Sequence, residues 1–323
     1  MQKSGALTTK KRGRFEGGRT LGEALVRDFK MHKWKYLLIS PIIIYLFLFS
    51  YRPMQGLIIA VKDFRPALGI WESPWADPWF RHFRSWFTDP FFFRLMRNTL
   101  SLSVLNLIFG FPAPIILALL LNELRNQKFK LVVQTISYMP FFISMVVIAS
   151  LIRTYMSFGG LFSQIAVFFG GEPRNFLMIS RYWFPMFIIS DIWQLVGWQS
   201  IIFLAAIASI DQEQYEAATI DGATRIQQMF RITLPNLVPI IMILLILRMG
   251  SLIGVNFEKV MLLYNPAIYN VADVIATYVF RRGIQQAQFS FATAVGTFNS
   301  LLNVILLITA NFLSRKYTET ALF

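Results

Sequence analysis

Apolar residues occur along the chain in six long runs that polar connections separate. The runs cover about residues 37–60, 98–121, 131–152, 183–209, 236–257 and 290–313. Each run is long enough to span a membrane, because an α-helix needs ~20 residues to cross a hydrocarbon core of ~30 Å. The short alternating segments of a membrane β-barrel are not found in the sequence. The pattern predicts an all-α polytopic membrane protein with six transmembrane helices.

The composition supports this prediction and excludes several kinds of chemistry. Only 15% of the 323 residues are charged, whereas about a quarter are charged in an average soluble protein. The chain has no cysteine and two histidines, His32 and His82, so it offers no thiolate chemistry and little for a metal site. A phosphate-binding glycine loop and a serine nucleophile elbow are also missing. We therefore expect no enzyme activity, no cofactor and no metal in this chain itself.

The distribution of charge predicts the orientation of the helices. Residues 1–36 hold ten Lys or Arg against three acidic residues, and an excess of basic residues is typical of the cytoplasmic side. Nucleic-acid binding is the alternative for such a tail, and the apolar chain disfavours it. An even number of spans places both termini in the cytoplasm. The predicted organisation is a basic tail over 1–36, a membrane domain over 37–315 and a short tail over 316–323.

The connection 61–97, which this topology places outside, is rich in aromatic residues. They are Trp71, Trp75, Trp79, Trp86 and the run Phe91-Phe92-Phe93. Such side chains favour the interface between membrane and water, so the connection is predicted to lie along the outer surface of the membrane. A docking face for an external partner is the alternative.

The cytoplasmic connection 211–235 has the pattern of two short helices. Asp211 is placed to cap the first helix, with Gln214 as its reciprocal partner. Gly222 permits a sharp corner, and Pro235 suits the first turn of the fifth span. Both helices continue into membrane spans. A soluble partner that binds this connection in a groove could therefore move the membrane helices.

This connection resembles the EAA loop of bacterial ABC importer permeases. The loop of that family reads EAA, three residues, Gly, nine residues and Ile-x-Leu-Pro. The matching positions are Glu216, Ala217, Ala218, Gly222, Ile232, Leu234 and Pro235. The resemblance implies that 211–235 couples the permease to an ATP-binding subunit.

Further stretches are similar to the carbohydrate branch of these permeases, including that of an alginate importer. They include 50–56, 97–100 and 134–140. The resemblance implies a type I ABC importer permease in the bacterial inner membrane that moves an oligo- or polysaccharide by alternating access. It also implies a second homologous permease subunit and an external solute-binding protein. ATP and Mg would be bound by two partner ATP-binding subunits.

Polar and aromatic residues within the fourth and fifth runs are candidates for a substrate path. They are Asp191, Trp193, Gln194, Trp198 and Gln199 in the fourth run, and Arg248 and Asn256 in the fifth. Polar groups at membrane depth are costly, so they are functional hypotheses by default. Amides suit sugar hydroxyls, tryptophan rings suit sugar C–H faces, and Arg248 suits the carboxylate of an acidic sugar. The structural alternative is that Asp191 pairs with Arg248 and Trp198 packs between helices.

The residues themselves leave two other classes of function open. A channel or secondary transporter for another polar solute would work without ATPase partners. A non-translocating membrane scaffold would tolerate leucine at the polar positions of the fourth and fifth runs. The resemblance of 211–235 to the EAA loop disfavours the first class.

Overall fold

A computed structural model describes residues 29–254 and 256–318, and within them the chain is helical and forms no strand. Most of the basic tail predicted at 1–36 and the last residues of the tail predicted at 316–323 lie outside the described residues. Six helical segments are long and apolar enough to span a membrane. They are Lys33–Val61, Phe92–Glu123, Met145–Phe168, Ser180–Ala208, Arg225–Met249 and Phe289–Lys316. The prediction of an all-α polytopic membrane protein is confirmed.

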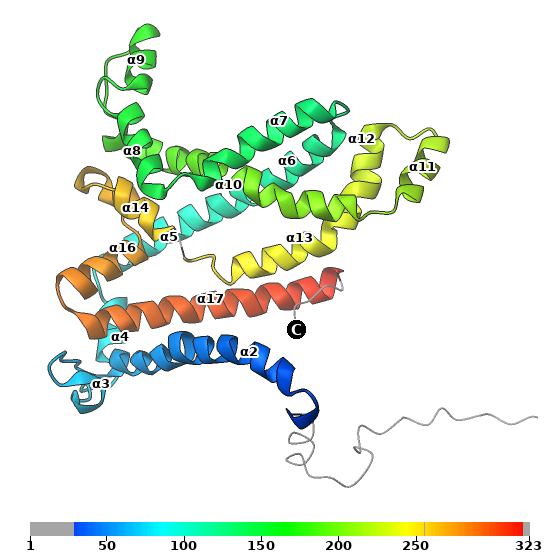
Figure 1. The fold of residues 1–323 in the computed structure, drawn as a ribbon. Coiled ribbons are helices and arrows are strands. Elements are labelled where there is room, and N and C mark those ends of the chain that lie inside the picture. The colour runs from blue at the N-terminus through cyan, green and yellow to red at the C-terminus, as the bar shows by residue number, and fades with distance from the viewer. Residues whose placement is uncertain (1–28, 255, 319–323) are drawn as a thin grey trace, which may run out of the picture. The chain divides into compact units, whose positions relative to one another are not determined.

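The chain divides into two units, Met1–Leu57 and Ile58–Phe323, each of which is considered by itself. The first contains α2 (Lys33–Leu46) and a π-helical turn over Phe47–Tyr51; the 3₁₀ helix Arg52–Val61 follows. The helices of the second unit are α3 (Gly69–Glu72), α4 (Arg81–Phe87), α5 (Phe92–Leu105), α6 (Pro112–Glu123), α7 (Gln127–Tyr138), α8 (Met145–Met156), α9 (Leu161–Phe168), α10 (Trp183–Ala208), α11 (Gln212–Ile220), α12 (Arg225–Gln228), α13 (Leu234–Met249), α14 (Phe257–Leu263), α15 (Tyr269–Ala272), α16 (Ile275–Phe280) and α17 (Phe289–Thr318). In this unit, α11 and α12 lie at one end, and α4, α16 and the start of α17 lie at the other (Figure 1).

Helix α10 is the centre of the second unit, because it packs against α6, α7 and α13. Near the 211–235 loop, Ile115 of α6, Phe203 of α10 and Leu237 of α13 belong to one buried apolar cluster. At the opposite end a second cluster joins α4, α5, α16 and α17 around Trp86 and Tyr278. Trp86 is fully buried, so this residue differs from the interfacial position predicted for the tryptophans of 61–97.

The third span differs from the predicted continuous run 131–152. Helix α7 ends at Tyr138, a 3₁₀ turn follows, and α8 begins at Met145. Pro140 lacks the N–H that a continuing helix needs, and the side chain of Ser144 accepts from the backbone N–H of Val147 as a new N-cap. The apolar helical segment that is long enough to span therefore starts at residue 145 and extends to 168.

The fifth span also ends earlier than predicted. Helix α13 stops at Met249, and Arg248 consequently lies in its last turn rather than midway along the span. Asn256, predicted at the outer end of this span, is instead the N-cap of α14, where its side chain accepts from the N–H of Lys259 at 3.2 Å.

Gly197 lies where α10 crosses α7. A Cβ atom at this position would overlap the carbonyl group of Ser137 and lie 2.9 Å from the nitrogen of Tyr138. We expect Gly197→Ala to push the two backbones apart and to destabilise the bundle by about 1–3 kcal/mol. Thermal unfolding of the purified protein in detergent measures this. Gly296→Ala in α17 is the matched control, because a Cβ there meets no atom within 4 Å; equal stability of the two variants would contradict the close crossing.

Candidate functional site

A cavity of about 460 Å³ lies among the segment 106–114, α10 and α13. Its polar lining consists of Asn106, Asp191, Gln199, Arg248 and Ser251. The ring of Trp198 and apolar side chains such as Phe111 and Leu195 form the remainder of the wall. A lining of this kind, mostly apolar with a few convergent polar groups, is typical of a site for a small molecule.

The polar groups of this cavity form one hydrogen-bonded chain. The guanidinium of Arg248 donates to Oδ1 of Asn106, and Nδ2 of Asn106 donates to Oδ2 of Asp191 at 2.8 Å. The other carboxylate oxygen of Asp191 accepts from Nζ of Lys259 at 2.7 Å. Asn106 thus presents its oxygen to a cation and its nitrogen to an anion, which satisfies both at once.

The local backbone makes room for Asn106. Residues 106–110 form a π-helical turn between α5 and α6, a feature that is common at functional sites. Within this turn a Cβ on Gly110 would lie only 2.9 Å from Oδ1 of Asn106. A glycine at this position therefore leaves the amide free to reach both Arg248 and Asp191.

Lys259 of α14 belongs to this network, and the sequence reasoning missed it. It is 0% exposed, and Nζ also donates to the carbonyl of Phe187 at 3.1 Å while lying 4.6 Å from the centre of its ring. Burial lowers the pKa of Lys259, and the charge and hydrogen bond of Asp191 oppose this effect. In the sequence Lys259 stands just after the fifth apolar run and next to Glu258. Such a context is typical of a lysine on the protein surface.

The candidates for a substrate path separate into two groups. Asp191, Trp198, Gln199 and Arg248 line the cavity, and Trp198 stacks on Phe141 at 4.4 Å between ring centres.

The other candidates lie elsewhere. Trp193 lines a separate apolar cavity with α8 and α9, Gln194 is buried in α10, and Asn256 caps α14. The direct ion pair of Asp191 with Arg248 does not form: Asp191 pairs with Lys259, and Asn106 stands between Asp191 and Arg248.

The 211–235 loop has the predicted two short helices and the predicted corner. The side chain of Asp211 accepts from the N–H of Glu213 and caps α11, while Gly222 adopts a φ of 77° between α11 and α12. Gln214 is not the reciprocal capping partner; it accepts from Nδ2 of Asn236 at 3.1 Å. A reciprocal capping box occurs instead between Thr224 and Gln227 at the start of α12.

Side chains of the loop attach it to the bundle on one side and leave it free on the other. Tyr215 shares a hydrogen bond of 2.9 Å with Thr233, and Leu234 packs into the cluster of α6, α10 and α13. Ile232 is partly buried, whereas Pro235 is exposed. Glu216 and Ala217 are exposed, Ala218 is half-buried, and Ile220 is 86% exposed. This side of α11 therefore takes no part in the packing of the bundle.

Comparisons with known proteins place these features in context. A family model described as "Binding-protein-dependent transport system inner membrane component" matches residues 110–319. Protein LplB of Bacillus subtilis (strain 168) is 44% identical over 94% of this chain and 95% of its own length. The polygalacturonan/rhamnogalacturonan transport system permease protein YteP of the same organism is 46% identical over 90% of each chain.

Solved structures are similar over nearly the whole chain. One is the crystal structure of a bacterial ABC transporter involved in the import of the acidic polysaccharide alginate. Its matching chain has a TM-score of 0.84 and 42% identity over 91% of this chain and 99% of that chain. The other is a bacterial alginate ABC transporter in complex with an alginate pentasaccharide-bound periplasmic protein, with a TM-score of 0.83 and 40% identity over 94% and 99% of the two chains.

The charge arrangement of the cavity predicts which double substitution restores a stable bundle. Lys259→Met alone leaves the carboxylate of Asp191 buried without its cation, which costs about 3–5 kcal/mol. Adding Asp191→Asn removes that charge, so we expect the double variant to recover most of the stability. Thermal unfolding in detergent measures both. Asp191→Asn with Arg248→Gln is the matched control, and we expect no recovery because Lys259 then stays unpaired. Wild-type stability of Lys259→Met alone would contradict the pairing.

Proposed function

The chain belongs to the family of binding-protein-dependent transport system inner membrane components, and from this premise we propose the part it plays in an importer. It is the permease subunit that moves an oligo- or polysaccharide across the membrane in an ATP-driven ABC importer. The observation that carries the proposal is the polar cavity between α10 and α13, two helices that continue directly into the 211–235 loop. A change at the loop is thereby transmitted to both walls of the cavity.

The lining of the cavity supports an acidic saccharide as substrate. Gln199 and Ser251 offer donors and acceptors for sugar hydroxyls, and Trp198 offers an aromatic face for C–H groups. The guanidinium of Arg248 contacts the neutral amide of Asn106 rather than a carboxylate, so its charge is available to a sugar carboxylate. Relatives named for the transport of polygalacturonan and alginate support the same class.

Coupling is assigned to the 211–235 loop. In this proposal Glu216, Ala217, Ala218 and the exposed Ile220 of α11 meet a cleft of the ATP-binding subunit. The hydrogen bonds of Tyr215 and Gln214 to the start of the fifth span would carry its movement into the bundle. Ile232, Leu234 and Pro235 form the junction with that span rather than the contact surface.

The remaining partners follow from the same proposal. Two ATP-binding subunits hold ATP and Mg, a second homologous permease subunit completes the path, and an external solute-binding protein delivers the saccharide. The related alginate transporter in complex with its periplasmic protein supports the last of these partners. Hydrolysis of ATP is assigned to the two ATP-binding subunits.

The loop test uses two substitutions that leave the bundle folded. Glu216→Ala removes an exposed charge, and Gly222→Val disfavours the left-handed backbone at the corner by about 1–3 kcal/mol. We expect normal membrane expression with uptake of an oligogalacturonate and substrate-stimulated ATP hydrolysis both reduced at least tenfold. Reconstituted complexes in liposomes measure both activities.

The matched control for the corner is Gly159→Val. Gly159 has a similar φ of 76° with no atom within 4 Å of a Cβ, but it lies between α8 and α9, away from the loop. The Gly159→Val variant should have the same local backbone strain and still transport the oligogalacturonate. Normal uptake by both loop variants would refute the coupling assignment.

The orientation of the chain has a separate test. We propose that both termini are cytoplasmic and that residues 61–97 are external. Single cysteines at the exposed positions Phe80 and Thr219 can be labelled without background, because the chain has no cysteine. A membrane-impermeant thiol reagent on intact cells with a permeabilised outer layer should label position 80 alone. Labelling of position 219 would reverse the proposed topology.

A further inference from the structure

A second polar cavity, of about 470 Å³, is lined by residues of α4 and of the start of α17, two elements that lie away from the 211–235 loop (Figure 1). Its charged lining is Asp63, Arg65, Arg81, His82 and Arg282, and we call it the arginine cavity. The segment after residue 61 supplies Asp63 and Arg65, α4 supplies Arg81 and His82, and the π-helical turn Arg281–Gln285 supplies Arg282. None of these residues lines the cavity beside α10.

Positive charge exceeds negative charge in the arginine cavity. Asp63 accepts from Arg81 and contacts Nε2 of His82 at 3.0 Å. Arg65 and Arg282 make no ion pair with any carboxylate of the described residues, whereas Arg81 does. Three guanidinium groups therefore face one carboxylate, which makes the cavity attractive to an anion.

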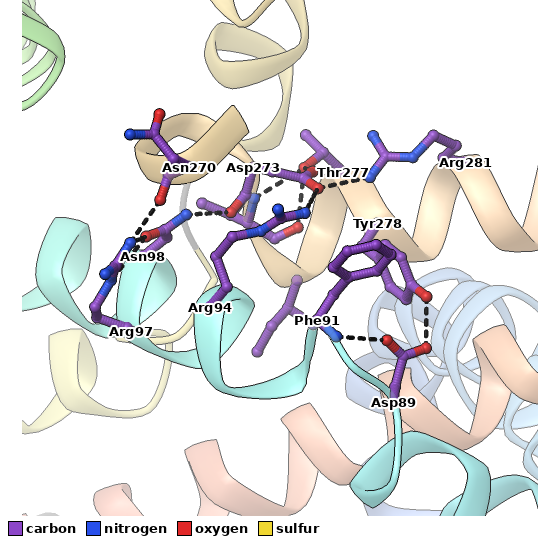
Figure 2. A network of polar contacts seen from close by, with 12 residues as sticks. Asp89, Phe91, Arg94, Arg97, Asn98, Asn270, Asp273, Thr277, Tyr278 and Arg281 are labelled. Carbon is purple, nitrogen blue, oxygen red and sulfur yellow. Dashed lines mark hydrogen bonds and ion pairs between the residues drawn. The ribbon is translucent and has the colours of Figure 1, made fainter. Parts of the chain in front are cut away.

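Neighbouring interactions direct Arg282 away from the acids nearby. The preceding residue, Arg281, forms an ion pair of 2.6 Å with the fully buried Asp273, and Arg94 lies 3.7 Å from the same carboxylate (Figure 2). The hydroxyl of Tyr278 donates to Asp89 at 2.6 Å, as Figure 2 also shows. These contacts satisfy the local carboxylates without Arg282.

Arg282 is instead held by aromatic faces. Its guanidinium carbon lies 5.1 Å from the ring centre of Phe291 and 5.7 Å from that of Tyr278. Its Nε is buried and finds no hydrogen-bond acceptor in the described part of the chain. Cation–π contacts orient the guanidinium plane but give the Nε–H group no acceptor, and an unpaired buried donor favours a rearrangement that supplies one.

The rest of the wall suits a sugar ring. Phe64 and Phe289 meet edge to face at 5.9 Å, and the N–H of Phe64 donates to the buried Ser290 at 2.9 Å. Ala287, at the same cavity, has a φ of 54°, a left-handed conformation that non-glycine residues seldom adopt. Such backbone is held in place by its surroundings and is concentrated at binding sites.

We propose that the arginine cavity is a reception site for carboxylate-bearing saccharides before they enter the cavity beside α10. The inference rests on the proposed import function and assigns the recognition of substrate charge to Arg65 and Arg282. Guanidinium groups form forked hydrogen bonds with carboxylates, and the aromatic rings accept the C–H faces of the sugar. Two arginines without a carboxylate partner among the described residues, beside one open cavity, fit a ligand with repeated carboxylates better than one acidic side chain of a docking protein.

The test compares an oligogalacturonate with its carboxyl-reduced, neutral counterpart in uptake by the reconstituted importer. The variants are Arg65→Gln, Arg282→Gln and both together. Each single change should raise the half-saturating concentration of the oligogalacturonate about tenfold, the factor that corresponds to about 1.4 kcal/mol, with the maximal rate unchanged. The neutral saccharide should be transported as by the wild type, and Arg282→Lys, which keeps the charge, should recover part of the loss.

Arg84→Gln is the matched control, because Arg84 is exposed on the same helix as Arg81 and lies outside the cavity. Arg65 is exposed, so Arg65→Gln carries the test if Arg282→Gln fails to assemble. Unchanged half-saturation in both variants overturns the reception site while leaving import intact. An equal loss for the charged and the neutral saccharide identifies a docking surface for the binding protein and also overturns it. A wild-type importer that takes up neither saccharide refutes the proposed function itself.

Discussion

The buried ion pair of Lys259 and Asp191 is the interaction on which the second unit depends. Both side chains are almost completely buried, at 0% and 8% exposure, so each charge requires a partner within the protein. The pair joins α14 to α10, and Asn106 extends it to the turn between α5 and α6 and to Arg248 of α13. Four segments, the turn between α5 and α6, α10, α13 and α14, are thereby joined by one network beside the cavity.

The hydrogen-bonded network around Asp191 also connects the cavity with the 211–235 loop. Helix α10 carries Asp191 in one half and ends at Ala208, directly before α11; at 1.5 Å per residue its 26 residues span about 39 Å. Helix α13 begins at the loop and carries Arg248 in its last turn. Because Asn106 stands between Asp191 and Arg248, a relative movement of α10 and α13 must break or rearrange these hydrogen bonds. The loop and the cavity are thus mechanically linked through two continuous helices.

The features that could be predicted from the sequence are those that a few neighbouring residues determine. Six apolar runs, the capping role of Asp211 and the corner at Gly222 depend on spacing, side-chain type and backbone freedom within a few residues. Hydropathy groups 131–152 into one run because it does not register the hydrogen-bond donor that Pro140 lacks, although the proline itself marks the interruption that the structure has there.

Contacts across helices could not be predicted in the same way. The sequence does not reveal that Lys259 folds back over Phe187, because that contact spans 72 positions. Arg248 therefore seemed the natural partner of Asp191. With Lys259 in that place, one carboxylate faces two cations across the network, and one positive charge remains uncompensated. It resides at Arg248, whose side chain bonds, within the described part of the chain, to the neutral Asn106 alone. In the proposed function, this one unbalanced cation attracts an anionic solute without binding it as firmly as a matched ion pair would, and a solute that has to pass through must be released again.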